Sequence, residues 1–270
     1  MMNPQGRIFG WSKQDFMAQA AIEHRDAMEE RYAGSIARSI KNTHLYSYSV
    51  TAGKQRKRKL PVITVEGRDT VSAITSYAGK YHNPNTRHGK VAALNFASYT
   101  TPGGGYLTGS RAQEEALCHE STLYNVLARQ EPYYAWNRQH LGSGMYRNRA
   151  LYSPDVLFFQ DNQVYRCDII TCAAPNRSGK SCLKDSESVN TRVLTERIKF
   201  VLMLAEKEEV DTLILGAWGC GVFGQNPVQV AELFRTELCS QPYGFSRVIF
   251  AIPKSISNTN FLDFSRVFQR

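Results

Sequence analysis

The 270-residue sequence contains no run approaching the ~20 consecutive apolar residues that a membrane-spanning helix needs. Its N-terminal segment also lacks the apolar core of about 7–15 residues that marks a secretory signal. We therefore expect an intracellular, soluble protein with no membrane partner. The six cysteines form no CxxC pair and show no metal-ligand spacing, so neither a disulfide scaffold nor a metal site is expected, and no cofactor is predicted.

Acidic residues are scarce relative to basic ones: 24 Asp+Glu stand against 33 Lys+Arg, which gives a formal net charge of +9. Such a surface attracts polyanions in a salt-dependent way, so weak nucleic-acid affinity through basic patches is one expectation. Residues 54–59 contain five cations, a run that also suits a solvated loop or a nuclear signal. Residues 132–154 contain Arg138, Arg147 and Arg149 and no acid.

No Pro-, Ser- or Gly-rich linker divides the chain, whose length fits one large domain or two small ones. We expect one α/β domain over residues 61–270, with residues 1–60 forming an N-terminal helical extension packed on it. Apolar residues at helical spacing predict a helix over Lys13–Ala33 in that extension. Ser12 can cap its start, and Gly34 suits a left-handed stop.

Short apolar runs alternate with helical patterns along the rest of the chain. The extended segments expected are His44–Val50, Pro61–Glu66, Val91–Phe96, Val156–Phe159, Cys167–Cys172, Thr212–Leu215 and Arg247–Ile252. Helices are expected over Arg111–Arg129, over Val189–Lys207 and after the capping pair Asn226-Pro227. This alternation predicts a three-layer α/β/α sandwich in which ligand-binding loops follow the carboxyl ends of strands.

Two glycine-rich loops follow buried strands. Gly103, Gly104 and Gly105 come after Val91–Phe96, where absent side chains let backbone N–H groups approach an anionic ligand. Taken alone, three glycines also suit a plain turn. The second loop, residues 216–224, contains four glycines, and its Trp218 and Phe223 offer flat surfaces to a ribose or a base. Two such loops beside one cleft suggest a diphosphate ligand.

Two adjacent carboxylates follow the first glycine loop. Gln113, Glu114 and Glu115 stand at or just inside a predicted helix start, where the helix dipole stabilises negative charge. In isolation this placement is ordinary helix electrostatics. Beside a loop that holds phosphates and a sugar, one carboxyl comes within proton-transfer reach of a glycosidic oxygen.

At this point the motifs resemble a known family. Residues 102–115, PGGGYLTGSRAQEE, are similar to the GGG and QEE signature of poly(ADP-ribose) glycohydrolases. The segments LNFASYTTPGGG, SPDV, CAAPN and LGAWGCGVFGQNP are similar to the microbial, macrodomain-only branch, and the likeness extends from about Val62 to Ile252. The resemblance implies a macrodomain over residues 61–270, with a mixed, roughly six-stranded sheet and ADP-ribose in a cleft across the strand ends.

The resemblance also implies roles for individual residues. Glu115 would be the catalytic acid/base and Glu114 would bind ribose hydroxyls. Phe223 would orient the distal ribose, Asn95 would lie near that ribose, and Asp69 would accept from the adenine amino group. The remaining residues expected at ADP-ribose are Gly103, Gly104, Gly105, Gln113, Gly219, Cys220, Gly221, Val222 and Gly224.

The implied reaction is hydrolysis of the ribose–ribose O-glycosidic bonds of poly(ADP-ribose), with release of ADP-ribose from a free polymer end. The substrate partner would be poly(ADP-ribose) or an ADP-ribosylated protein. Two alternatives remain open: hydrolysis of mono-ADP-ribose from protein or nucleic-acid adducts, and binding of ADP-ribose without cleavage. The intact residues 113–115 argue against the second, since binding alone does not need the acid.

Two features have roles that the sequence leaves open. His119 occupies a place where relatives in this branch often carry Arg, and it is either a partly buried helix residue or a modulator of the pKa of Glu115, four residues earlier. Residues 133–149 interleave aromatic rings and cations, which suits either a surface that stacks polymer bases or a capping loop.

Overall fold

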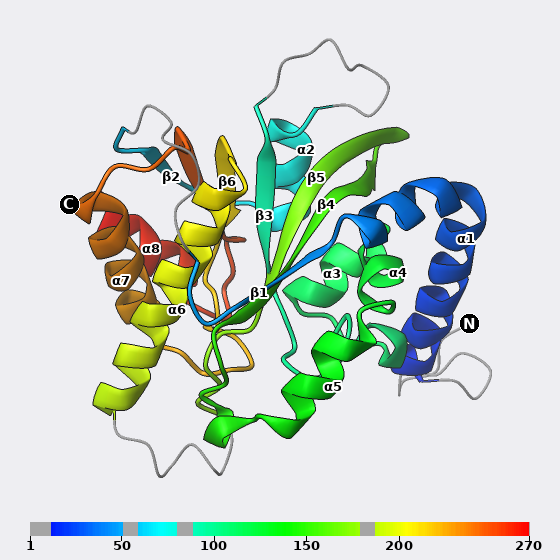
Figure 1. The fold of residues 1–270 in the computed structure, drawn as a ribbon, viewed down its shortest axis with the longest axis horizontal. Coiled ribbons are helices and arrows are strands. Elements are labelled where there is room, and N and C mark those ends of the chain that lie inside the picture. The colour runs from blue at the N-terminus through cyan, green and yellow to red at the C-terminus, as the bar shows by residue number, and fades with distance from the viewer. Residues whose placement is uncertain (1–11, 51–58, 80–88, 179–186, 270) are drawn as a thin grey trace.

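The computed structural model describes residues 12–50, 59–79, 89–178 and 187–269, which form a mixed seven-stranded sheet with helices on both faces (Figure 1). The strands run in the order β1-β4-β5-β3-β6-β7-β2. Their bounds are β1 His44–Ser47, β2 Val62–Glu66, β3 Val91–Phe96, β4 Arg149–Gln160, β5 Gln163–Cys172, β6 Thr212–Leu215 and β7 Arg247–Ala251. The α/β class and the helix-covered sheet are confirmed.

Five neighbouring strands, β5-β3-β6-β7-β2, are parallel, so their carboxyl ends meet at one edge of the sheet. β3 is buried along almost its whole length, as expected for a central strand covered on both faces. β4 and β1 add to β5 in antiparallel pairs. The seventh strand, β1, comes from residues that we assigned to the N-terminal extension, and the boundary between residues 1–60 and 61–270 stays a prediction.

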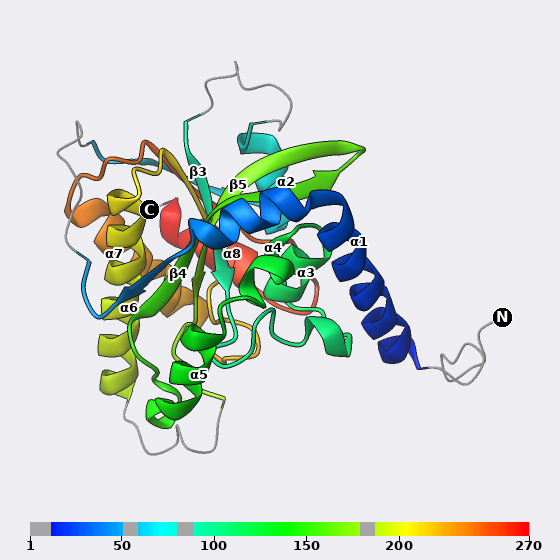
Figure 2. The same cartoon turned by 45° about the vertical axis from the view of Figure 1, so that its right-hand side comes forward.

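The helices cover the sheet in two layers (Figures 1 and 2). One face carries α2 Thr70–Tyr77, α3 Gln113–His119 and α4 Leu123–Leu127, with α1 Lys13–Lys41 packed outside them. The other face carries α6 Glu187–Lys207, α7 Pro227–Ser240 and α8 Asn260–Phe268. α5 Glu131–Gln139 and the short 3-10 turns Tyr106–Thr108 and Gly142–Gly144 complete the described elements. None of the helices in the described ranges is long and apolar enough to cross a membrane.

The first helix is longer than the sequence pattern indicated. α1 continues through Gly34, and only Tyr32 departs from helical geometry, with φ −128° and ψ 23°. Tertiary contacts hold the additional turns: Ile36 is fully buried, and Ser39 Oγ donates to the Pro154 carbonyl at 2.7 Å. The expected stop at Gly34 was therefore wrong, because packing against β4 outweighs the low helix propensity of glycine.

The helix expected over Arg111–Arg129 is two helices, α3 and α4. The residues between them pair with β4: Thr122 N donates to the Leu157 carbonyl at 3.0 Å, and Phe159 N donates to the Glu120 carbonyl at 2.9 Å. These bonds to β4 take the place of helical bonds at residues 120–122, so the helix is interrupted there. The break turns α4 away from α3 and leaves α3 as a short helix whose first residues face the strand ends.

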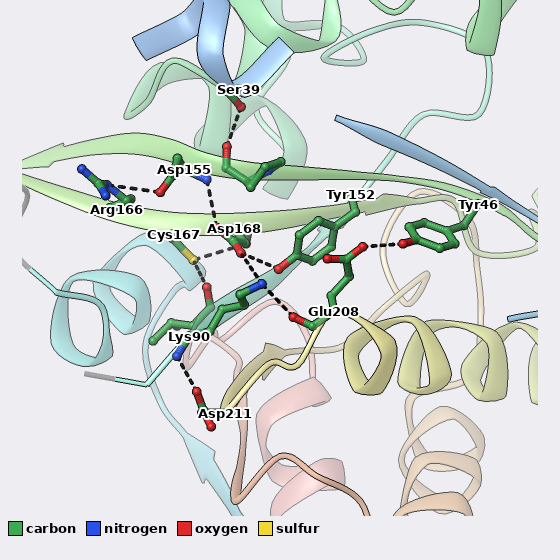
Figure 3. A network of polar contacts seen from close by, with 12 residues as sticks. Ser39, Tyr46, Lys90, Tyr152, Asp155, Arg166, Cys167, Asp168, Glu208 and Asp211 are labelled. Carbon is green, nitrogen blue, oxygen red and sulfur yellow. Dashed lines mark hydrogen bonds and ion pairs between the residues drawn. The ribbon is translucent and has the colours of Figure 1, made fainter. Parts of the chain in front are cut away.

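Figure 3 shows a polar network centred on Asp168, which pairs with Ala92 near the amino end of β3. Asp168 on β5 accepts from the Tyr152 hydroxyl and, at 2.9 Å, from Asp155 N. Lys90 Nζ lies 3.9 Å from Asp168 Oδ2 and donates to the Glu208 carbonyl at 2.7 Å. Burial raises the pKa of Asp168, so this carboxyl is harder to ionise than an exposed one.

Candidate active site

The four loops after β2, β3, β6 and β7 surround a cleft of about 740 Å³ at the carboxyl edge of the sheet. Asp69 follows β2, residues 98–105 follow β3, residues 217–223 follow β6 and residues 252–260 follow β7, and members of each segment line the cleft. The start of α3 forms a further wall. Both glycine loops and the acidic pair therefore share one hollow, as the sequence predicted.

Gly104 is the point at which the first loop meets the acids. It has φ +58°, and a Cβ there would lie 2.6 Å from Glu115 Oε1 and 3.0 Å from Glu114 Oε2. Only glycine allows both carboxylates this close to the loop backbone. Gly103, at φ +66°, is close to the Tyr124 ring and does not line the cleft, so its missing side chain serves packing.

Glu115 is buried, with a relative exposure of 6%, at the inner wall of the cleft. Its Oε1 accepts from Gly105 N at 2.8 Å and its Oε2 accepts from Ala112 N at 3.0 Å. The second bond closes the first turn of α3, where the helix dipole also favours negative charge. The carboxylate is thus fixed between the glycine loop and the helix start.

Glu114 is held by donors from β3 and from the segment that follows it. Its Oε2 accepts from Ser98 N at 2.6 Å and its Oε1 accepts from Asn95 Nδ2 at 3.1 Å. Burial raises the pKa of Glu114 to about 8, a shift that these hydrogen bonds only partly offset. Asn95 is fully buried and does not line the cleft, so in this structure it holds Glu114.

Gln113 lines the cleft, but its amide is engaged by the protein. Its Oε1 accepts from Phe96 N at 2.8 Å, and its Nε2 donates to the Leu94 carbonyl at 2.9 Å and to Thr70 Oγ1 at 3.2 Å. The side chain therefore fixes the start of α3 on β3 and α2. This contact sets the position of the two glutamates that follow.

The second glycine loop is a rigid turn. Gly219 has φ +78°, and its carbonyl accepts from Gln225 N at 2.9 Å. Gly219, Gly221, Val222 and Phe223 line the cleft, and Val222 is 74% exposed. Cys220 and Gly224 do not line it.

Trp218 lines the cleft, but contrary to expectation its indole presents no exposed flat surface to a ligand. The indole is fully buried, and its Nε1 donates to the Cys172 carbonyl at 3.2 Å. A buried tryptophan needs a partner for its N–H, and β5 supplies it. Trp218 thus anchors the loop to the sheet, while Phe223 remains at the cleft.

Asp69 lines the end of the cleft formed by β2. Its side chain also caps α2, accepting from Ser72 N at 2.7 Å through Oδ1. Its other oxygen, Oδ2, accepts no hydrogen bond from the described residues. An adenine amino group is one donor that this oxygen suits.

The aromatic and basic segment after α4 is largely packed into the protein. Arg149 is buried, donates from Nε to Asn137 Oδ1 at 3.0 Å and lies 4.0 Å over the Trp136 ring. It therefore does not belong to a surface patch, unlike the exposed Arg138 and Arg147. The cations of residues 54–58 lie outside the described residues.

His119 is partly buried behind the first glycine loop. Its ring contacts the ring of Tyr106 edge-on at 4.7 Å, and its Nε2 has no hydrogen-bond partner within the described ranges. Burial, assisted by Arg111, lowers the pKa of His119, so the imidazole is neutral near pH 7.

Several residues of the site were missed by the sequence reasoning. Ser98 contributes a backbone donor, Thr70 receives the Gln113 amide, and Arg111 lines the cleft just before α3. These three residues could have been predicted because they stand next to recognised motifs in the sequence. Ser255 and Asn258 could not, because the position of their loop depends on the parallel pairing of β7. In the part of the chain that is described, no three His, Cys, Asp or Glu side chains gather as a metal site requires.

A family model and several solved structures match this chain. The family model described as "Microbial-type PARG, catalytic domain", where PARG stands for poly(ADP-ribose) glycohydrolase, matches residues 13–161. No curated protein matched the sequence.

Solved structures are similar over nearly the whole chain. Poly(ADP-ribose) glycohydrolase from Thermomonospora curvata is 30% identical, with a TM-score of 0.77 and coverage of 94% of this chain and 99% of that chain. The same enzyme bound to the inhibitor ADP-HPD is 32% identical, with a TM-score of 0.76 and coverage of 93% and 98%. The enzyme from Deinococcus radiodurans in complex with ADP-ribose is 31% identical, with a TM-score of 0.72 and coverage of 87% and 96%. The chain therefore belongs to the microbial-type poly(ADP-ribose) glycohydrolase family of enzymes.

Proposed function

We propose that this chain hydrolyses ribose–ribose O-glycosidic bonds of poly(ADP-ribose) and releases ADP-ribose, with Glu115 as the general acid and base. One observation carries the assignment of Glu115. Its carboxyl group lies at the wall of the cleft, next to the loop expected to hold the diphosphate, and backbone donors fix both of its oxygens. A proton donor must be held in this way to act on one particular glycosidic oxygen.

The two glycine loops would hold the diphosphate between them. Gly104 and Gly105 form one wall of the cleft, and Gly219 and Gly221 form part of another. Backbone N–H groups without side chains are suited to anionic oxygens. Phe223 would then pack on the distal ribose.

The polar residues would bind the two ends of ADP-ribose. Glu114 would bind hydroxyls of the distal ribose, with Asn95 holding it in place, and Asp69 at the β2 end would accept from the adenine amino group. Gln113 would act by positioning α3. Cys220, Val222 and Gly224 would contribute through the backbone of the second loop.

The reaction would proceed in two proton transfers. Glu115 first gives a proton to the leaving ribose oxygen as the glycosidic bond breaks and positive charge develops on the distal ribose. Gly105 N and Ala112 N then stabilise the carboxylate that remains. That carboxylate next takes a proton from the attacking water, which restores the acid.

Glu115→Gln tests this mechanism. The amide keeps the size of the side chain but cannot donate or accept the transferred proton, so we expect turnover of poly(ADP-ribose) to fall by about 10²–10⁴-fold or more. ADP-ribose affinity, measured by calorimetry, should change little. The matched control is Glu232→Gln on the exposed side of α7, which should leave both quantities unchanged. Turnover of the Glu115→Gln protein at the wild-type rate would remove the assignment.

The same assay separates the alternative functions. Defined poly(ADP-ribose) and a peptide carrying a single ADP-ribose are each incubated with the wild-type protein, and free ADP-ribose is measured. Release from the polymer supports the proposal, and release from the peptide alone supports the mono-ADP-ribosyl hydrolase. Binding of ADP-ribose without release from either substrate would identify a reader.

We also propose weak nucleic-acid affinity through exposed basic residues. It rests on the net charge of +9 and on exposed cations such as Arg147. Arg138 is paired with Glu131, and Arg149 is buried, so less of the charge is free than the sequence suggested. Any such binding should be salt-dependent and should not require the cleft.

A further inference from the structure

A second hollow, of about 1150 Å³, lies between α1, the starts of α2 and α3, and the tip of the β4–β5 hairpin. We call it the α1 groove. Asp69, Arg111 and Ala112 line both the α1 groove and the active-site cleft. The two hollows therefore share a rim, and Asp69, expected at the adenine, stands on it. Nothing in the proposed reaction uses the α1 groove.

The α1 groove contains two cations without an acidic partner. Arg31 on α1 and Arg111 before α3 are both exposed, and neither forms an ion pair with any residue of the described ranges. Some exposed arginines elsewhere do have such partners, for example Arg129 with Glu29 at 3.6 Å, whereas others such as Arg38 have none among the described residues, so it is the presence of two unpaired arginines at one hollow that matters. Unpaired guanidinium groups at one hollow are suited to phosphate oxygens, which they can bind through two donors at once.

Aromatic side chains also line the α1 groove. The rings of Tyr32 and Phe159 lie 4.8 Å apart at the base of the α1 groove, next to the non-helical turn of α1. His119 also lines it, and the Nε2 atom of this histidine has no hydrogen-bond partner in the described part of the chain. Aromatic side chains can stack nucleobases, so the rings of Tyr32 and Phe159 suit the base of a nucleotide ligand.

Carboxylates lie in the same hollow. Glu120 and Asp161 join Asp69 on its walls. A site for a bare polyanion would exclude these acids, because they repel phosphate. Sugar hydroxyls and amino groups, by contrast, donate to carboxylates. The combination of arginines, carboxylates and rings fits a ligand that carries phosphates, ribose hydroxyls and a base together.

We infer that the α1 groove is a second subsite, which binds the adenosine diphosphate moiety of the polymer unit adjoining the one in the cleft on its adenine side. This inference rests on the proposed function, because it assumes that the cleft holds ADP-ribose with its adenine near Asp69. The subsite increases the affinity for polymer over the affinity for the single unit. It also favours binding of internal units, which departs from the expectation of release from a free polymer end alone.

The experiment uses the Glu115→Gln protein, so that polymer survives the measurement. Affinities are measured for ADP-ribose and for length-fractionated poly(ADP-ribose) of several units, with and without Arg31→Gln. Arg38→Gln, an exposed arginine of the same helix that does not line the α1 groove, is the matched control. Thermal unfolding of each variant verifies that α1 remains folded.

We expect Arg31→Gln to weaken polymer binding by about five- to tenfold, the effect of losing one charged hydrogen bond at an exposed site. ADP-ribose binding should not change, and Arg31→Glu should weaken polymer binding further. Arg38→Gln should have no effect on either ligand. The net positive charge attracts any long polyanion, so each Arg31 variant is compared with Arg38→Gln, which removes one positive charge outside the α1 groove, by the ratio of polymer affinity to ADP-ribose affinity.

Equal polymer-to-monomer affinity ratios in the parent, the Arg31 variants and the Arg38 variant would overturn the subsite, even if polymer binds more tightly than monomer. That result would place the additional contacts on the side of the cleft where the leaving unit departs. Failure of the proposed function has a different signature: the parent protein would not bind ADP-ribose, or the wild-type protein would not release it from polymer.

Discussion

At the scale of single residues, the site depends on how closely a backbone turn approaches two carboxylates. The sequence predicted which residues take part, since Gly104, Glu114 and Glu115 belong to a recognisable motif, and the structure brings them together. It did not predict which aromatic and basic residues remain accessible. Trp218 and Arg149 are buried by strands and helices that are distant in the sequence, so a local sequence pattern cannot predict their burial.

Gly104→Ala tests the close approach at this turn. The new methyl group would stand 2.6 Å from Glu115 Oε1, and the residue would have to keep φ at +58°. Either the loop or the carboxylate must move, so we expect kcat/KM to fall by about 10²-fold or more, as for a displaced catalytic group. Backbone strain should also lower the free energy of unfolding by about 1 kcal/mol.

Gly34→Ala is the control for this substitution. A Cβ at Gly34 meets nothing within 4 Å, and the residue lies inside α1. Alanine should raise the free energy of unfolding by about 0.5–1 kcal/mol there and leave activity unchanged. Unaltered kinetics in Gly104→Ala would show that the turn does not position Glu115.

At the scale of elements, strands were predicted better than helices. Val91–Phe96 and Thr212–Leu215 have the bounds that the sequence indicated, because a buried parallel strand is a continuous apolar run. The break between α3 and α4 could not be predicted, since residues 120–122 have a helical pattern and leave the helix only to pair with β4. α8 was not expected at all.

The contact between α1 and the first glycine loop makes an element-scale prediction possible. Tyr106 follows the loop directly, and its hydroxyl bonds to His24 Nδ1 and to the Ala21 carbonyl, both at 2.9 Å. Tyr106→Phe removes both bonds and leaves the half-buried His24 Nδ1 without this partner, so we expect a loss of about 1–3 kcal/mol in the free energy of unfolding. Hydrogen exchange in α1 should accelerate.

Tyr124→Phe is the matched control for this contact. Tyr124 packs on the Tyr106 ring with centroids 4.9 Å apart, and its hydroxyl has no hydrogen bond among the described residues. Its loss should change stability by less than about 0.5 kcal/mol. Equal effects of the two substitutions would mean that ring packing, and not the hydroxyl contact, joins α1 to the loop.

At the scale of the whole molecule, the fold class followed from the alternation of strands and helices, and the family resemblance supplied the sheet. The distribution of buried charge followed from neither. Glu114 lies at the carboxyl ends of the strands and Asp168 lies near the amino end of β3, and burial raises the pKa of both. Whether an acidic residue in a strand or at a helix start is desolvated depends on which helices and strands pack over it. Only the folded structure shows that packing.

This buried charge predicts how stability depends on pH. Burial raises the pKa of Glu114 to about 8, above its ordinary value of 4.5, so the folded protein holds this proton more tightly than the unfolded chain does. Its contribution is therefore fully present below about pH 4.5 and is lost as the pH rises through about 8. Burial lowers the pKa of His24 from 6.5 to about 4, so the folded protein holds this proton less tightly than the unfolded chain does. The effect of His24 is therefore to increase stability as the pH rises, and this increase is complete above pH 6.5.

Between pH 6.5 and 8 the contribution of His24 is constant, and the Glu114→Gln variant separates the contribution of Glu114 from that of Asp168, whose pKa burial also raises. We expect the free energy of unfolding, measured by urea denaturation at closely spaced pH values, to fall with a slope of up to about 1.4 kcal/mol per pH unit. Glu114→Gln cannot ionise and should flatten this slope, whatever its effect on absolute stability, whereas Glu232→Gln should retain it. Parallel curves for wild type and Glu114→Gln would mean that Glu114 is already ionised in the folded protein at neutral pH, and that its bonds to Ser98 and Asn95 outweigh its burial.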